Sequence, residues 1–147
     1  MVARTQPGRV LPSRPVPFVD PDNRPFWTGG ESGALMIQRC RACGHWIHPV
    51  APVCRRCRGT DVGPERASGS GRVATYTVNY QPWVPGSEPY IIAWVELAEQ
   101  EHLILTTNLV DVEAEDVRFG MEVEVVFEKH PQADVWFPLF RPAGAAS

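Results

Sequence analysis

The 147-residue sequence lacks any long hydrophobic run, and this absence separates it from several classes of protein. No apolar stretch approaches the ~20 residues that a membrane-spanning helix needs. Residues 1–10 hold no apolar run long enough for the core of a signal peptide. We therefore expect a cytoplasmic protein without a membrane partner. No flavin or nicotinamide fingerprint, internal repeat or low-complexity tract is visible, so neither a redox enzyme nor a repeat architecture is indicated.

Groupings of residues that would carry catalysis are also missing. His102 and His130 lie beside acids without a Cys or Ser nucleophile pattern around them, and we expect both on the surface. Glu113, Glu115 and Asp116 crowd one loop. Acid–base chemistry by paired carboxylates needs a protected, apolar setting, whereas this run is typical of a solvated loop. We expect no catalytic residue here and no enzyme activity of the chain by itself.

The cysteines that are present form a C-x2-C-x10-C-x2-C pattern, namely Cys40, Cys43, Cys54 and Cys57. Two such turns supply four anionic sulfur ligands, which suit one tetrahedral, closed, structural zinc site. Two disulfides are an alternative that a reducing cytosol disfavours. Iron in the same sulfur cage, as in an electron carrier, is another. Because four thiolates fill a tetrahedral zinc, we expect His45 and His48 to pack or to form hydrogen bonds.

Charge is unevenly distributed along the chain, although the net charge is only −3. Residues 39–72 hold seven Arg against two acids, a net +5, whereas residues 73–147 hold three basic residues against twelve acids, a net −9. A basic segment beside an acidic body suggests one local anion site. Some of the arginines that flank the cysteines could hold phosphates or acidic partner residues, and a solvated basic surface is the alternative. They are Arg39, Arg41, Arg55, Arg56 and Arg58.

The pattern of prolines, glycines and alternating apolar residues predicts a mainly β protein with an N-terminal helical segment, a rubredoxin-like zinc ribbon and a five-stranded OB-fold barrel. Helix signals cover residues 22–30 and reach about residue 34, and β-alternation begins at Gly69. The predicted strands of the barrel are residues 71–80, 90–97, 102–110, 121–128 and 135–140. The expected divisions are a flexible arm (1–17), a helical segment (18–34), the zinc ribbon (35–68), the OB-fold (69–142) and a tail (143–147).

Three aromatic residues are candidates for an interface with a partner protein. Trp83 lies in a proline-stiffened loop between the first two barrel strands, where it could contact a partner or fold back as a lid. The last strand is apolar on both faces, with Trp136 and Phe140 on one face and Phe137 on the other. Its second face must meet the ribbon, the N-terminal helix or another protein, and we favour another protein.

A series of short motifs runs through residues 18–142: Pro21-Asp-Asn-Arg-Pro-Phe-Trp27, Leu35-x-Ile-Gln-Arg-Cys40, Cys43-Gly44, Pro49, Gly69-x-Gly71, Tyr76-Thr77, Pro89-Tyr90, Val95-x-Leu97, Thr107-Asn108, Gly120-Met121 and Phe140-Arg-Pro142. No single motif is specific. In their order and spacing, however, the chain resembles a family of bacterial and archaeal proteins that join an N-terminal helical piece, a zinc ribbon and an OB-fold. Members of that family are acyl-CoA-associated proteins that accompany thiolase-like enzymes.

The resemblance implies a non-catalytic accessory subunit that docks on a thiolase-fold partner and helps bind or channel an acyl-CoA thioester. Partners in the family include acyltransferases, thiolases and the aldolases that shorten steroid side chains. A two-fold symmetric partner would give a heterotetramer with this chain. The arginines of the ribbon agree with a CoA ligand, because phosphates favour Arg forks.

A nucleic-acid-binding module is the alternative function, because zinc ribbons and OB-folds both serve that purpose. OB-folds that bind single strands need a basic groove with stacking aromatic residues. The net −9 of residues 73–147 disfavours this function. We therefore expect no nucleic-acid partner.

Overall fold

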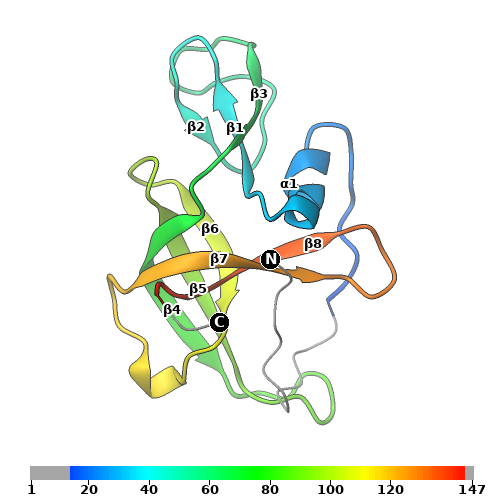
Figure 1. Ribbon diagram of the computed structural model, residues 1–147, viewed down its shortest axis with the longest axis vertical. Coiled ribbons are helices and arrows are strands. Elements are labelled where there is room, and N and C mark those ends of the chain that lie inside the picture. Colours follow the sequence, from blue (N-terminus) through cyan, green and yellow to red (C-terminus); the bar gives the residue numbers. More distant parts are fainter. Residues whose placement is uncertain (1–13, 145–147) are drawn as a thin grey trace.

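Figure 1 shows a three-stranded ribbon that stands on a closed five-stranded barrel, with a short helical segment at their junction. The computed structural model describes residues 14–144. The predicted flexible arm and C-terminal tail fall largely on residues 1–13 and 145–147, outside the described residues. In chain order the elements are α1 (Arg24–Thr28), the 3-10 helix η1 (Gly29–Ser32), β1 (Met36–Cys40), β2 (Trp46–Ile47), β3 (Val62–Arg66), β4 (Ser70–Asn79), β5 (Tyr90–Leu97), β6 (Ile104–Leu109), the 3-10 helix η2 (Ala114–Asp116), β7 (Glu122–Lys129) and β8 (Trp136–Pro142).

The helical segment is slightly shorter than the sequence predicts. The Asp20 carboxylate accepts the backbone N–H groups of Asp22 and Asn23, each at 2.9 Å, and this turn delays the helix to residue 24. Pro25 is tolerated in the first turn because its missing N–H would have no partner there. The chain leaves η1 through Gly33 at φ 72°, a left-handed conformation that favours glycine.

The ribbon has β1 at its centre, paired antiparallel with β2 on one side and β3 on the other. The sequence analysis missed β3, because Gly63 and Pro64 are typical of a turn. Pro64 is tolerated because β3 is an edge strand, so one of its sides needs no ladder hydrogen bonds. Gly63 leaves room for the Arg41 guanidinium, which lies where a Cβ at this position would be.

The barrel has the strand order β4-β5-β6-β8-β7. A bulge between Val73 and Thr75 bends β4, which allows a long strand to curve around a small barrel. Parallel pairing of Leu109 in β6 with Phe140 in β8 closes the sheet. The strands predicted from alternation are confirmed, with ends that shift by one or two residues.

The ribbon and the barrel share one hydrophobic core. Leu35, Ile37 and Trp46, all at the base of the ribbon, belong to the same buried cluster as the inward-facing barrel residues. The Gln100 side chain, from the β5–β6 loop, accepts the Trp46 backbone N–H at 2.9 Å and donates to the Trp46 carbonyl at 3.0 Å. These contacts fix the ribbon to the barrel.

The structure shows what contacts the last strand within the chain. The face of β8 that carries Phe137 is partly covered by the chain's own N-terminal part, and Phe137 stays half-buried beside an open pocket, so an additional protein contact there stays a prediction. Trp27 of α1 meets the Phe137 ring edge-on with centroids 5.7 Å apart, and the Arg14 guanidinium lies 5.4 Å from the centre of the same ring. Phe140, on the opposite face, is 0% exposed inside the barrel core. Apolar periodicity predicted burial correctly but could not show which segment provides it.

Within residues 14–144, no helix has the length and apolar character to cross a membrane.

Candidate metal centre

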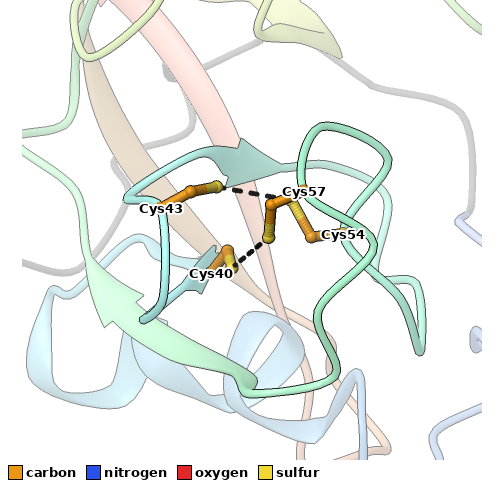
Figure 2. A group of neighbouring side chains, drawn as sticks. All are labelled: Cys40, Cys43, Cys54 and Cys57. Atoms are coloured by element: carbon orange, nitrogen blue, oxygen red, sulfur yellow. Dashed lines mark hydrogen bonds between the residues drawn. The ribbon is translucent and has the colours of Figure 1, made fainter.

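Figure 2 shows the four cysteine side chains converging at the tip of the ribbon. Their sulfur atoms all lie within 4.8 Å of one another. The shortest separations join one cysteine of each turn: 3.6 Å from Cys40 Sγ to Cys57 Sγ, and 3.7 Å from Cys43 Sγ to Cys54 Sγ. A disulfide needs about 2.05 Å, whereas a tetrahedron with metal–sulfur bonds of about 2.3 Å has edges of about 3.8 Å. The geometry fits one tetrahedral metal ion.

Two similar backbone turns aim the sulfurs at this point. In the first turn the Gly44 N–H donates to the Cys40 carbonyl at 2.8 Å, and in the second the Arg58 N–H donates to the Cys54 carbonyl at 2.8 Å. Both donors have positive φ, 81° at Gly44 and 62° at Arg58. The sequence supplies glycine at the first position but an arginine at the second, where a left-handed backbone costs about 1–2 kcal/mol.

The thiols of the site have unequal affinities for protons. The backbone N–H of Cys43 lowers the pKa of Cys40, and the backbone N–H of Cys57 lowers the pKa of Cys54 to about 7. The Gly59 N–H, which donates to Cys57 Sγ at 3.3 Å, lowers the pKa of Cys57. The neighbouring thiols and burial outweigh this effect and raise the pKa of Cys57 to about 11. The backbone thus favours thiolates, and four of them need a cation to offset their mutual repulsion.

The two histidines of the ribbon lie outside this set of four ligands. The His48 ring packs on the Phe26 ring with centroids 5.1 Å apart, so it connects the ribbon to α1. Burial lowers the pKa of His48, so its neutral form is favoured. The His45 carbonyl accepts the Cys40 N–H at 2.8 Å and closes the first turn. His48 packs as expected, whereas the bond of His45 is made by its backbone, so the role of its side chain stays a prediction.

The structure divides the five candidate arginines into two groups. Arg39 donates to the Gly44 carbonyl at 2.9 Å, forms an ion pair with Glu65 at 3.0 Å and lies over the Trp46 ring. Arg41 forms an ion pair with Asp61 at 3.1 Å. These two are engaged within the ribbon.

The other three arginines flank the second pair of cysteines: Arg55, Arg56 and Arg58. All are exposed, and none forms an ion pair within residues 14–144. We call this second group the knuckle arginines, and they are the candidates that have no ion-pair partner among the described residues.

The predicted interface residues also lie in different environments. Trp83 is 74% exposed, so its loop is not a lid on the barrel. Trp136 is half-buried, with Gly30 of η1 pressed against its Cβ and Lys129 Nζ 5.3 Å from its ring centre. Phe140 has no exposed surface and is corrected to a core residue.

Two further residues differ from what the sequence suggested. His130 is 8% exposed and not on the surface: its Nδ1 accepts the Gln132 N–H at 3.0 Å, and its Nε2 lies 3.2 Å from the Arg14 carbonyl. Phe119 was not singled out, yet it is 73% exposed. The sequence held one indication that Phe119 is exposed, because this large aromatic residue lies within an acidic connection, Asp111 to Gly120.

Comparison with known proteins extends these findings. Residues 27–63 match the family model described as "ChsH2, rubredoxin-like zinc ribbon domain", and residues 64–128 match "ChsH2, C-terminal OB-fold domain". A chain in a solved structure described as "Ltp2-ChsH2(DUF35) aldolase" is 36% identical, with a TM-score of 0.75. The match covers 87% of this chain and 99% of that one.

Two curated relatives are similar over different shares of their length. A "Probable enoyl-CoA hydratase alpha subunit" of Thermomonospora curvata is 37% identical over 131 residues, which are 88% of this chain but 40% of the relative. A "DUF35 domain-containing scaffold protein" of Methanocaldococcus jannaschii is 37% identical over 102 residues, 67% of this chain and 71% of the relative. The present chain therefore spans less than half of the first relative and most of the second.

Proposed function

Because this chain belongs to the ChsH2 family of proteins that join a rubredoxin-like zinc ribbon to an OB-fold, we propose that it is a non-catalytic accessory subunit of an acyl-CoA enzyme with the thiolase fold. The observation that carries the proposal is the match to a chain of an aldolase structure, because it covers 99% of that chain. The relatives described as an alpha subunit and as a scaffold protein support the same role.

The metal centre supports a structural role over a catalytic one. We assign it one zinc ion, because four cysteine sulfurs close a tetrahedron and leave no open position for a substrate. The site then stabilises the ribbon tip, on which the knuckle arginines are exposed. This chain supplies a rigid, charged surface and not a reacting group.

We further propose that the knuckle arginines help bind the phosphates of the acyl-CoA thioester. Arginine guanidinium groups form paired hydrogen bonds with phosphate oxygens. Arg39 and Arg41 are already paired inside the ribbon, so Arg55, Arg56 and Arg58 are the residues left to act. The partner is an aldolase, thiolase or acyltransferase of the thiolase fold, and a two-fold partner gives a heterotetramer.

Co-expression with a thiolase-fold protein from the same genome tests the proposal. We expect one peak of heterotetramer size in size-exclusion chromatography, and partner activity that falls when this chain is left out. Separate elution at micromolar concentration, together with full activity of the partner alone, would show that the accessory role is wrong.

The CoA contact has its own test within the purified complex. Replacing the three knuckle arginines by alanine should raise the KM for the acyl-CoA substrate about tenfold while the complex stays intact. Arg72→Ala is the matched control, because Arg72 is an exposed barrel arginine paired only weakly with Glu122 at 3.7 Å. An equal rise in KM for both variants would contradict a specific role for the knuckle.

A further inference from the structure

Three large aromatic side chains are exposed at the end of the barrel that lies opposite the ribbon. Tyr80 and Trp83 belong to the β4–β5 loop and are 71% and 74% exposed, and Phe119 belongs to the β6–β7 loop. Figure 1 shows both loops at the end of the barrel farthest from the zinc ribbon. Since each aromatic residue offers about 150–250 Å², the three present on the order of 400 Å² of apolar surface. Phe119 lies beside Tyr76 and Trp83 lies beside Asn79, so these rings are spread along β4 over a distance that one partner surface can cover.

Hydrogen bonds and ring contacts hold these side chains in place. The Trp83 indole N–H donates to the Asn79 Oδ1 at 3.2 Å, and the Asn79 amide donates to the Gln81 carbonyl at 2.8 Å. Phe119 packs on Tyr76 of β4 with ring centroids 5.4 Å apart. The Tyr76 hydroxyl in turn donates to the Val117 carbonyl at 3.4 Å. Aromatic residues that are ordered before binding lose little conformational entropy in an interface.

Acidic residues border the aromatic ones. Glu88 lies in the Trp83 loop, and Glu113, Glu115 and Asp116 precede Phe119. All four are exposed, and none forms an ion pair within the described part of the chain. A partner surface that carried acids here would be repelled, whereas lysines and arginines around an apolar recess would match it.

We propose that this barrel end is the docking surface for the partner enzyme, and that the partner presents an apolar recess bordered by Lys or Arg side chains. This inference rests on the proposed accessory function and specifies which face is used. Tyr80 and Trp83 fill the recess, Phe119 makes a second apolar contact beside Tyr76, and the four acids meet the basic border. The zinc ribbon then points away from this contact.

The test measures binding of purified variants to the co-expressed thiolase-like partner by surface plasmon resonance. Trp83→Ala should weaken binding about 30-fold, the size of an interface hot spot, mainly through faster dissociation. Its thermal midpoint should not change, because the removed ring is exposed and outside the core. Phe119→Ala provides a second, independent probe of the same surface.

The matched control is Trp94→Ala. Trp94 is also an exposed tryptophan, at 53%, but it lies halfway along β5 on the side of the barrel. We expect less than a threefold change in affinity. A loss at Trp94 equal to or larger than that at Trp83 would overturn the proposed face.

Charge is tested by combining Glu113→Gln, Glu115→Gln and Asp116→Asn. Association should slow about tenfold and lose much of its salt dependence, because the acids steer a basic partner. Faster association would instead identify the partner surface as acidic and overturn the proposal. If the wild-type chain itself fails to bind, the accessory function is wrong; if it binds and Trp83→Ala binds equally well, only the choice of face is wrong.

Discussion

Removal of the metal should unfold the tip of the ribbon but leave its base attached to the barrel. The perturbation is either a chelator or Cys54→Ser, which deletes a ligand with no exposed surface. The tip has only a small hydrophobic cluster of its own, in which Ile47 packs with Cys40 and Cys54. One buried isoleucine contributes about 2–3 kcal/mol, whereas structural zinc in small domains contributes about 10–16 kcal/mol. The metal therefore decides whether the tip is ordered.

The boundary of the unfolded region follows from the shared core. Leu35, Ile37 and Trp46 pack with barrel residues, and the Ala67 N–H donates to the Leu35 carbonyl at 2.8 Å. These contacts need no metal. We expect the amides of residues 40–45 and 50–62 to lose protection, while those of Trp46, of the rest of the ribbon base and of β5 keep theirs.

Hydrogen–deuterium exchange measures this boundary. Losing even about 3 kcal/mol of local stability raises the exchange rate about 100-fold. Ala42→Ser, which changes an exposed residue of the first turn without touching a ligand, should exchange like the wild type. Unchanged protection of residues 40–45 and 50–62 in the metal-free protein would refute the argument, as would an equal loss of protection throughout β5.

Two further predictions concern the junction of ribbon and barrel. Gln100→Ala should lower the free energy of unfolding by about 2 kcal/mol in urea titrations, because it removes two hydrogen bonds to the Trp46 backbone at about 1 kcal/mol each. Gln100→Glu keeps the acceptor alone, so its free energy of unfolding should lie between those of the wild type and Gln100→Ala. No loss of stability in either variant would mean that water replaces both bonds. Burial lowers the pKa of His48 in the folded protein. In the unfolded chain this pKa has its ordinary value of about 6.5. When the pH falls below about 6.5, the unfolded chain therefore binds a proton that the folded protein does not bind. The free energy of unfolding should therefore be higher at about pH 7.5 than at about pH 5.5. His48→Phe, which keeps a ring against Phe26, should reduce this dependence of stability on pH. An unchanged pH dependence in His48→Phe would show that His48 is not its source.

The parts of the fold that depend on local chemistry could be predicted from the sequence. Paired cysteines at two-residue spacing define the metal site, because two turns of that length aim four sulfurs at one point. Alternation of apolar residues defines β5 and β7, because one face of each strand must be buried. Neither inference needs knowledge of what the chain contacts elsewhere.

The parts that failed depend on contacts between distant segments. β3 was missed because Gly63 and Pro64 are typical of a turn, and the strand is apparent only from its pairing with β1. The cover on Phe137 comes from Trp27, which is 110 positions earlier in the sequence. His130 was placed on the surface because its neighbours are polar, but its ring bonds the Arg14 carbonyl 116 positions away. Periodicity shows that a side chain is buried and says nothing about the partner.

The positive charge of the ribbon is not shared equally among its arginines. Residues 39–72 have a formal net charge of +5 when the cysteines are counted as neutral. A zinc ion with four thiolates carries −2, which leaves about +3 on the metal-bound ribbon. Arg39 and Arg41 are neutralised locally by Glu65 and Asp61.

Of the charge that remains, the knuckle arginines carry +3 beside the −2 of the zinc–thiolate centre, and Arg66 and Arg72 carry the other +2. The ribbon tip lies at the opposite end of the molecule from the acidic, aromatic end of the barrel (Figure 1). This separation of charge gives the chain two ends that favour different ligands. We expect phosphates to favour the ribbon tip over the barrel end, and a basic partner surface to favour the barrel end over the knuckle. A subunit built this way can hold a partner with one end and an anionic substrate with the other, because neither ligand competes for the other's surface.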